Sequence, residues 1–302
     1  MNAKVLIACE ESQTVCKVFR DRGFEAYSCD IIEPSGNHPE WHILGDALKV
    51  IKAEKIVTMD GKTHYIGKWD LLIAHPPCTY LSNAGARHLW KNHLLNIERF
   101  EQGMKAKEFF MSFLNADIDK ICVENPVPSK VFTLPEYTQI IQPYQYGHPY
   151  TKRTCLWLKG LQPLVPTKIV KPIATWCPSG SYSREHGEQY KGMFTTDRAK
   201  NRAKTFSGIA EAMAEQWGFI MTIEETFDRN IDMSYEDIFV LHRRFDISHC
   251  GNSTDDINGC IIYQGDYYSM PKVLKGLHVS SFRCSRNVMS YDETDKWDIW
   301  VV

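Results

Sequence analysis

The sequence lacks several features that would assign it to a class at once. No run of about 18 apolar residues occurs among its 302 residues, so a membrane-spanning helix is not expected. The N-terminal residues carry charge early, at Lys4 and Glu10, and we expect a first strand there rather than a signal peptide. The formal net charge is -2, which excludes a strongly basic nucleic-acid binder and leaves such a role to a local basic surface. The sequence also contains no internal repeat.

The sequence also lacks the spacing of cysteines and histidines that is typical of metal sites. The 10 cysteines are scattered and none forms a Cys-x-x-Cys pair, so we predict no metal centre. Zinc in the C-terminal part is a weaker alternative, and the histidines of the N-terminal part match no common ligand pattern. Without a secretion signal, we expect reduced thiols and a cytoplasmic location. The residues considered are His38, His42, His64 and His75 in the first part, and Cys250, Cys260 and Cys284 with His242 and His249 in the second.

The composition changes near residue 220. Residues 1–218 hold 27 basic and 23 acidic residues, whereas residues 219–302 hold 8 basic and 14 acidic residues. The second part also contains short runs rich in aromatic and β-branched residues, at 237–242, 259–263 and 297–302, which are typical of strands. We therefore predict a catalytic domain over 1–218 and a small, acidic, β-rich domain over 219–302.

Strand-like and helix-like segments alternate in the first part. This order predicts an α/β fold with a doubly wound, mostly parallel sheet. In such a sheet functional groups gather at the carboxyl ends of the strands, where Glu10, Asp30, Cys78 and Glu124 all fall. The predicted strands are Lys4 to Cys9, Phe24 to Asp30, Asp70 to Ala74 and Lys120 to Asn125, and the predicted helices are Ser12 to Arg22, Ala47 to Ala53 and Leu94 to Leu114, with a turn at Ile43 to Asp46.

The most informative segment runs from Asp70 to Ser82. Its apolar residues lead directly into Pro76 and Pro77, whose rings stiffen the loop, and the next residue is Cys78. A thiol on a stiff loop after a strand is suited to act as a nucleophile. The alternative is a buried cysteine that serves as a small apolar side chain.

Polar residues elsewhere could assist this thiol. Glu124 and Asn125 end a later strand, and an acid there could protonate the ring nitrogen of a base to which a thiolate has added. Lys152 and Arg153 could lower the thiol pKa or hold an anionic group. The alternative for these two cations is a solvated pair at the start of a strand.

Taken in order, these residues resemble the cytosine C5 DNA methyltransferase family, over about residues 4–218. The family's Pro-Pro-Cys with a Ser four residues later is matched by Pro76 to Ser82, and its Glu-Asn by Glu124 and Asn125. Its Gly-x-Pro turn and Arg-bearing strand are matched by Gly147, Pro149 and the Lys152–Arg153 pair. Arg202 to Trp217 is similar to the helix that closes the family's catalytic domain. The chain would be a divergent member, phage-like or bacterial.

This resemblance implies a fold of the S-adenosylmethionine-dependent methyltransferase type and a mechanism. Cys78 would add to C6 of cytosine, Glu124 would contact N3, and a methyl group would pass from S-adenosylmethionine to C5. Duplex DNA would be the substrate, with the target base swung out of the stack. The implied catalytic residues are Cys78, Glu124, Asn125, Lys152 and Arg153, and the implied cofactor residues are Ala8, Cys9, Glu10, Asp30, Ile31, Asp46 and Pro76.

Three departures leave alternatives open. The loop from Ala8 to Ser12 has no glycine where the family has a Phe-x-Gly-x-Gly turn, and Thr79 stands where the family has Gln. Only about Gly160 to Lys200 is available for target recognition. A free pyrimidine nucleotide as substrate, or a donor other than S-adenosylmethionine, therefore remains an alternative. So does a catalytically silent module that binds nucleic acid or protein, the partner of 219–302 being unknown.

Overall fold

The computed structural model describes residues 3–86, 88–176, 202–228, 261–266, 282–286 and 296–301. The chain forms two compact units, Met1–Gly218 and Phe219–Val302, and each is described by itself. The predicted strand at 237–242, the second half of the expected recognition segment and Cys250 and Cys260 lie outside the described residues. Every helix in the described parts is too short or too polar to cross a bilayer.

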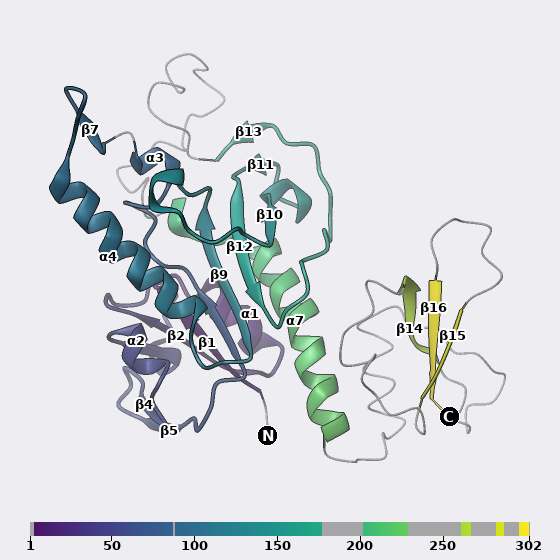
Figure 1. Cartoon of the computed structure of the whole chain (residues 1–302). Coiled ribbons are helices and arrows are strands. Elements are labelled where there is room, and N and C mark those ends of the chain that lie inside the picture. Colours follow the sequence, from purple (N-terminus) through teal and green to yellow (C-terminus); the bar gives the residue numbers. More distant parts are fainter. Residues whose placement is uncertain are drawn as a thin grey trace. The chain divides into compact units, whose positions relative to one another are not determined.

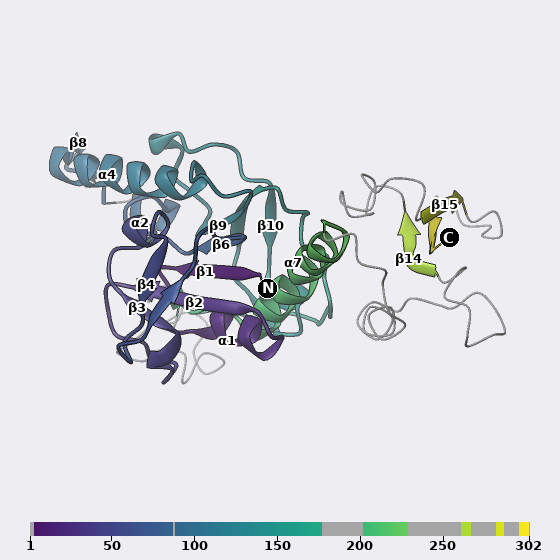
Figure 2. The same cartoon turned by 90° about the horizontal axis from the view of Figure 1, so that it is seen from below.

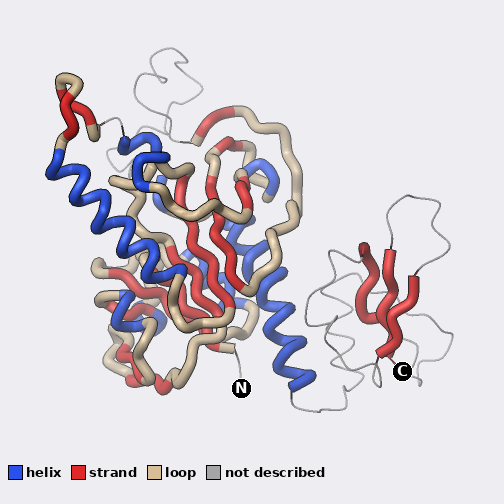
Figure 3. The backbone as a smooth tube through the Cα atoms, viewed as in Figure 1, coloured by secondary structure: helices blue, strands red, loops and turns tan. Residues whose placement is uncertain are grey.

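A seven-stranded sheet forms the centre of the first unit (Figures 1 and 3). Its spatial order is β10-β12-β9-β6-β1-β2-β3, which is 3-2-1-4-5-7-6 when these strands are counted along the chain. The five strands from β3 to β9 are parallel, whereas β12 is antiparallel to both of its neighbours. The predicted mostly parallel α/β sheet is thus confirmed. The strands are β1 (Lys4–Ala8), β2 (Glu25–Asp30), β3 (His42–Leu44), β6 (Leu71–Ala74), β9 (Lys120–Pro126), β10 (Gln139–Ile141) and β12 (Thr154–Lys159).

Helices cover both faces of this sheet (Figure 2). On one face lie α2 (Ala47–Val50) and α4 (Ile97–Leu114), and on the other lie α1 (Thr14–Asp21) and α7 (Ser207–Asp228). Central strands such as β1 and β6 are therefore buried on both sides, which explains their continuous apolar sequences. Ring contacts join α4 to the sheet, with the centroids of Phe110 and Trp157 4.9 Å apart.

The start of α4 differs from the prediction. Leu94 and Leu95 form strand β8 (Leu94–Leu95), which pairs with β7 (Trp90–Lys91) in a hairpin. The helix begins only at Ile97 because the side chain of Asn96 caps it, accepting a hydrogen bond from the Arg99 N–H at 3.1 Å. The turn between the strands is Asn92-His93, and both residues have positive φ, as a tight hairpin turn requires.

The remaining elements of the first unit are short. A turn was predicted at Ile43 to Asp46, but the backbone of His42–Leu44 pairs with Ser28 to Asp30 as edge strand β3. The others are η1 (Pro39–Trp41), β4 (Lys55–Val57), β5 (Thr63–Tyr65), α3 (Asn83–Ala86), η2 (Lys130–Phe132), η3 (Pro143–Gln145), β11 (Tyr150–Thr151) and β13 (Ala174–Thr175).

The second unit contains a three-stranded antiparallel sheet among its described residues. Its order is β14-β16-β15, with β14 (Ile261–Asp266), β15 (Phe282–Arg286) and β16 (Lys296–Val301). The strand-like runs at 259–263 and 297–302 coincide with β14 and β16. Strand β15 was not predicted, because charged and polar residues alternate there with Phe282 and Cys284.

Candidate functional site

The loop after β6 carries Cys78, and hydrogen bonds hold it in place. The His75 N–H donates to the Ala8 carbonyl at 2.9 Å, and the Ser82 N–H donates to the Cys78 carbonyl at 3.0 Å. The side chain of Asn125 donates to the Pro76 carbonyl at 2.8 Å. Asn125, predicted as catalytic, and the buried Pro76, predicted to bind cofactor, therefore join β9 to the loop. Their contact fixes the position of the cysteine.

Charges of both signs act on the Cys78 thiol. The side chain is half-buried, and burial together with the negative charge of Glu124 raises the pKa of the thiol. The positive charges of Lys152 and Arg202 act in the opposite direction. The structure thus brings Cys78, Glu124 and Lys152 together, as predicted, and adds Arg202.

A buried pair lies beside the thiol. His75 Nδ1 is 2.8 Å from Glu124 Oε2, although the two residues are 49 positions apart in the chain. Both side chains are about one-tenth exposed. Burial opposes charge on each of them, but their mutual hydrogen bond and attraction raise the pKa of His75 and lower the pKa of Glu124. These contacts thus favour an imidazolium and a carboxylate, joined between Nδ1 and Oε2.

Two further features distinguish His75 from the other described histidines. Its second ring nitrogen, Nε2, is buried and has no hydrogen-bond partner among the described residues. The charge of Glu10 also acts on His75. Sequence reasoning considered this histidine only as a metal ligand and missed its pairing. The available signal was its position, directly between a strand end and the diproline.

The adjacent cations Lys152 and Arg153 have different surroundings. Lys152 is half-buried, its ammonium donates to the Lys204 carbonyl at 3.4 Å, and its charge lowers the pKa of Glu124. Arg153 is exposed, and its charge acts on the Cys155 thiol instead. Both residues lie between β11 and β12, and of the two only the charge of Lys152 acts on the Cys78 thiol.

The carboxylate of Glu10 binds N–H groups at the start of α1. Its two carboxylate oxygens accept hydrogen bonds from the N–H groups of Val15 at 2.6 Å and Cys16 at 3.2 Å. Burial raises the pKa of this carboxyl to about 7. Glu10 was predicted to bind a cofactor, but these contacts make it a helix-capping residue, because unpaired N–H groups at a helix start attract an acceptor.

Other residues predicted to bind the cofactor gather at the ends of β1 and β2. The charges of Asp30 and Asp46 both raise the pKa of the Cys9 thiol, beside buried Ala8, after the larger effect of burial. Asp30 is half-buried, Oδ1 accepts from the Ile32 N–H at 3.3 Å, and the neighbouring Ile31 side chain is 78% exposed. A carboxylate beside an exposed apolar side chain suits a ribose and a base. Asp46 Oδ1 caps α2, accepting from the Leu48 N–H at 2.9 Å.

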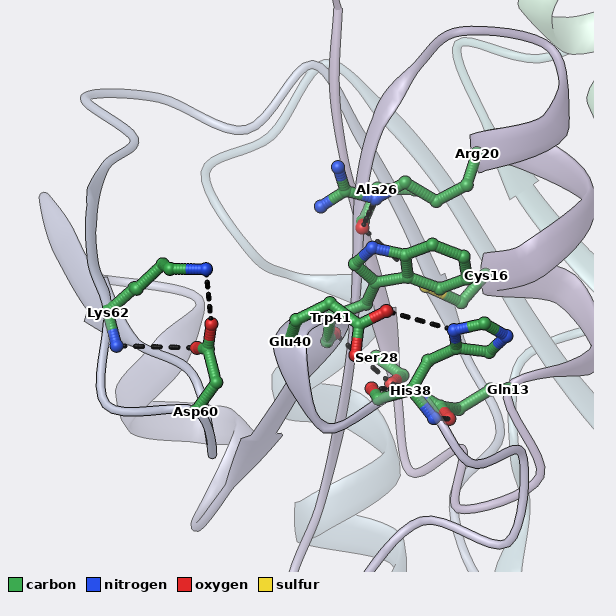
Figure 4. A network of polar contacts seen from close by, with 10 residues as sticks. All are labelled: Gln13, Cys16, Arg20, Ala26, Ser28, His38, Glu40, Trp41, Asp60 and Lys62. Atoms are coloured by element: carbon green, nitrogen blue, oxygen red, sulfur yellow. Dashed lines mark hydrogen bonds and ion pairs between the residues drawn. The ribbon is translucent and has the colours of Figure 1, made fainter.

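The loop after β1 keeps a glycine-like backbone without glycine. Cys9 and Gln13 both have a φ of 58°, in the left-handed region that glycine favours. The buried Gln13 side chain fixes the loop, donating to Ser28 Oγ at 3.1 Å and to the His38 carbonyl at 2.8 Å (Figure 4). Side-chain contacts thus replace the flexibility that the family's glycines would supply.

The network around Gln13 is structural (Figure 4). The ring of His38 stacks on Trp41 at 3.8 Å, and its Nδ1 is 2.9 Å from Glu40. The Arg20 guanidinium lies over the Trp41 ring at 5.6 Å. His42 is buried between Ser28 Oγ and the Ile32 carbonyl, and among residues with described side chains no group of three potential metal ligands comes together.

Comparisons with known proteins give little. No family model matches the chain, and no curated protein does. One solved structure, described as a "putative DNA modification methyltransferase encoded within prophage" from E. coli, is similar over 57% of this chain and 53% of that chain, at 13% identity and a TM-score of 0.32. The similarity spans about half of that protein, and at this TM-score it carries no inference about activity.

Proposed function

We propose that this chain is an S-adenosylmethionine-dependent methyltransferase that modifies C5 of cytosine in DNA. The observation that carries the proposal is the group formed by Cys78 and the His75–Glu124 pair, at the carboxyl ends of the adjacent strands β6 and β9. It unites a nucleophile with a proton source, which addition to a pyrimidine ring requires.

The sheet gives independent support. The five parallel strands have the order 3-2-1-4-5, and in such sheets ligands bind beyond the carboxyl ends, where the strand order reverses. Here the order reverses between β1 and β6. The reversal lies between Asp30, at the end of β2, and Cys78, after β6, so a cofactor and a substrate could meet there.

Cys78 Sγ forms a bond to C6 of the cytosine ring after losing its proton to water. Burial and Glu124 oppose this ionisation, whereas Lys152 and Arg202 favour it. As the bond forms, electron density moves through the ring to N3, which takes up a proton, and C5 becomes nucleophilic. After C5 has gained the methyl group, its proton passes to water, the C6–sulfur bond breaks to restore the thiolate, and N3 returns its proton to the His75–Glu124 pair.

The His75–Glu124 pair holds the proton that N3 takes up. His75 Nδ1 carries this proton in the ionised pair, and it can pass to Glu124, whose protonated carboxyl then donates a hydrogen bond to N3. His75 is a positioning residue in this scheme, because it acts on the substrate through Glu124. Lys152 steadies the same carboxylate through its charge.

The residues at the ends of β1 and β2 fit part of the proposed cofactor. Asp30 would bind ribose hydroxyls, Ile31 would cover the adenine, and the backbone around Cys9 would face the remainder. Glu10 would contribute nothing directly because its oxygens cap α1. When bound, S-adenosylmethionine supplies an electrophilic methyl group.

The experiment that tests this proposal traps the nucleophile. The full chain is incubated with duplex DNA containing 5-fluorocytosine and S-adenosylmethionine, since fluorine at C5 cannot leave as a proton. We expect a covalent adduct on Cys78, identified by mass spectrometry, and no adduct with Cys78→Ala. Cys155→Ala removes another free thiol and serves as the matched control.

A second arm compares labelled methyl transfer to DNA and to dCMP. We expect transfer to DNA only. Transfer to dCMP alone would overturn DNA as the substrate. An adduct that persists with Cys78→Ala would overturn the mechanism.

A further inference from the structure

A pocket of about 660 Å³ lies beside the loop that carries Cys78. It is bounded by Thr79 and Ser82 of that loop, by the β7–β8 hairpin and by the start of α4. Its volume is within the range of roughly 300–1,000 Å³ found for small-molecule sites. None of the residues discussed above for the chemical step or the cofactor lines it.

The wall of the pocket is tied rigidly to the loop of Cys78. Arg99 Nη2 donates to the carbonyls of Thr79 and Gly85, each at 3.2 Å, and its guanidinium lies over the Tyr80 ring at 5.0 Å. At Gly85 there is no space for a side chain, because an added Cβ would lie 2.2 Å from the Thr79 carbonyl oxygen. A ligand in this pocket would therefore sit at a fixed position relative to Cys78.

The chemistry of the lining favours an anion with an aromatic ring. His88, Lys91 and Arg99 line the pocket, and none of the described residues that line it is acidic. The side chain of Trp90 is 56% exposed, although a tryptophan can bury a large apolar surface. A free aromatic face beside a lysine is the combination that binds single nucleotides of a strand, by stacking and by phosphate contact.

We propose that this pocket holds the nucleotide next to the target cytosine in the substrate strand. Trp90 stacks on its base and Lys91 pairs with its phosphate. The inference rests on the proposed function, because it names where the neighbouring part of the DNA lies. Since stacking accepts any base, the pocket would position the strand without requiring a long recognition sequence.

The test uses the full chain and a short labelled duplex that contains one target cytosine. Affinity is measured by fluorescence anisotropy at several salt concentrations. We expect Trp90→Ala to weaken binding roughly tenfold at every salt concentration, because one stacked base is lost. We expect Lys91→Ala to reduce the slope of log affinity against log salt by about 0.9, because one phosphate contact is lost.

The β4–β5 hairpin provides matched controls in the same unit. Lys55 and Tyr65 face each other across it, both exposed, and neither lines the pocket. Lys55→Ala and Tyr65→Ala should bind DNA like the unchanged protein. A duplex with 2-aminopurine beside the target adds a direct readout, since its fluorescence should be quenched on binding unless Trp90 is replaced.

The outcomes separate this inference from the proposed function. If the unchanged protein forms the Cys78 adduct and Trp90→Ala and Lys91→Ala bind DNA normally, the pocket assignment is overturned and the proposed function stands. If the unchanged protein neither binds DNA nor forms the adduct, both are overturned. Quenching that survives Trp90→Ala also overturns the stacking role.

Discussion

Two buried glutamates at the same edge of the sheet have different partners and pKa values shifted in opposite directions. Glu10 follows β1 and Glu124 lies in β9, and each acts electrostatically on His75. Burial raises the pKa of Glu10 to about 7, and its oxygens are used by the N–H groups of α1. The pKa of Glu124 is lowered despite burial, because His75 and Lys152 favour its charge. The role of a carboxylate at a strand end thus depends on its partner. Backbone N–H groups make it a helix cap, whereas charged side chains keep it ionised and available for chemistry.

The same contrast extends to the two regions around these glutamates. At the ends of β1 and β3, Glu10 and Asp46 both cap helices, so these carboxylates stabilise the fold. At the ends of β6 and β9, the polar groups contact one another, and one nitrogen of His75 has no partner in the described part of the chain. The second region is therefore the more reactive one. Substitutions in the two regions should separate activity from stability.

His75→Gln should produce the largest change. Loss of the shared proton is expected to reduce the rate of methyl transfer to DNA by roughly 10²-fold, the lower end of the range for acid–base catalysis. The pair holds its proton below the raised pKa of His75, so the rate should fall as pH rises through that value. The profile of kcat against pH checks this, since the variant should lose the alkaline limb.

His64→Gln is the control for His75. His64 hydrogen-bonds Thr58 at 3.1 Å in the β4–β5 hairpin, away from the strand ends. The His64→Gln variant should keep both the rate of methyl transfer and the fall of this rate at high pH. An unchanged pH profile in His75→Gln would show that Glu124 acts without this histidine.

Lys152→Gln should have a smaller effect, about tenfold on transfer. A single nearby charge changes the ionisation of a thiol by about one pKa unit, and one unit is a factor of ten. The rate of Cys78 alkylation by iodoacetamide, followed against pH, should shift to higher pH in this variant. Arg153→Gln is the matched control, because that side chain is exposed and should leave the alkylation profile unchanged. Equal shifts in both variants would contradict the assignment.

Glu10→Gln should affect stability rather than chemistry, by about 1 kcal/mol, as expected for a lost helix cap. The folded pKa of Glu10, about 7, lies above its unfolded value of 4.5, so the folded state binds more protons between these values. Its contribution to stability is therefore fully present below pH 4.5 and is lost as pH rises to 7. Urea unfolding at several pH values should show that, in the variant, this fall in the free energy of unfolding between pH 4.5 and 7 disappears.

Asp30→Asn should show the opposite pattern to Glu10→Gln, with an effect on cofactor binding and not on stability. It should weaken binding of S-adenosylmethionine, measured by calorimetry, by about tenfold, the value of a hydrogen bond to a charged group. Urea unfolding should be nearly unchanged, because Asp30 is half-buried and its hydrogen bond with the Ile32 N–H is long, at 3.3 Å. If Glu10→Gln loses cofactor binding as well, the separation of the two regions is wrong.

Sequence reasoning located the elements because their signals are local. Gly23 ends α1, and the apolar run before the diproline is β6. It placed the start of α4 too early, because two leucines before a capping asparagine look helical until the cap is known. The site was predicted as a set of residues at strand ends, and within it the charges of Glu124 and Lys152 act on the Cys78 thiol. Glu10 caps α1 and Arg153 is exposed, so these two lie outside that group.

The sequence by itself determined that Cys78 follows a strand on a loop stiffened by two prolines, and that acidic residues end the neighbouring strands. Only the tertiary structure decided which acid lies near the thiol. The contact between His75 and Glu124 spans 49 residues and depends on the register of β6 against β9. The charge of Lys152 acts on the Cys78 thiol, whereas that of Arg153 acts on Cys155, and this difference depends on how the chain folds just before β12. Spacing along a chain contains neither the register nor the path of this turn, because both arise when the strands pair.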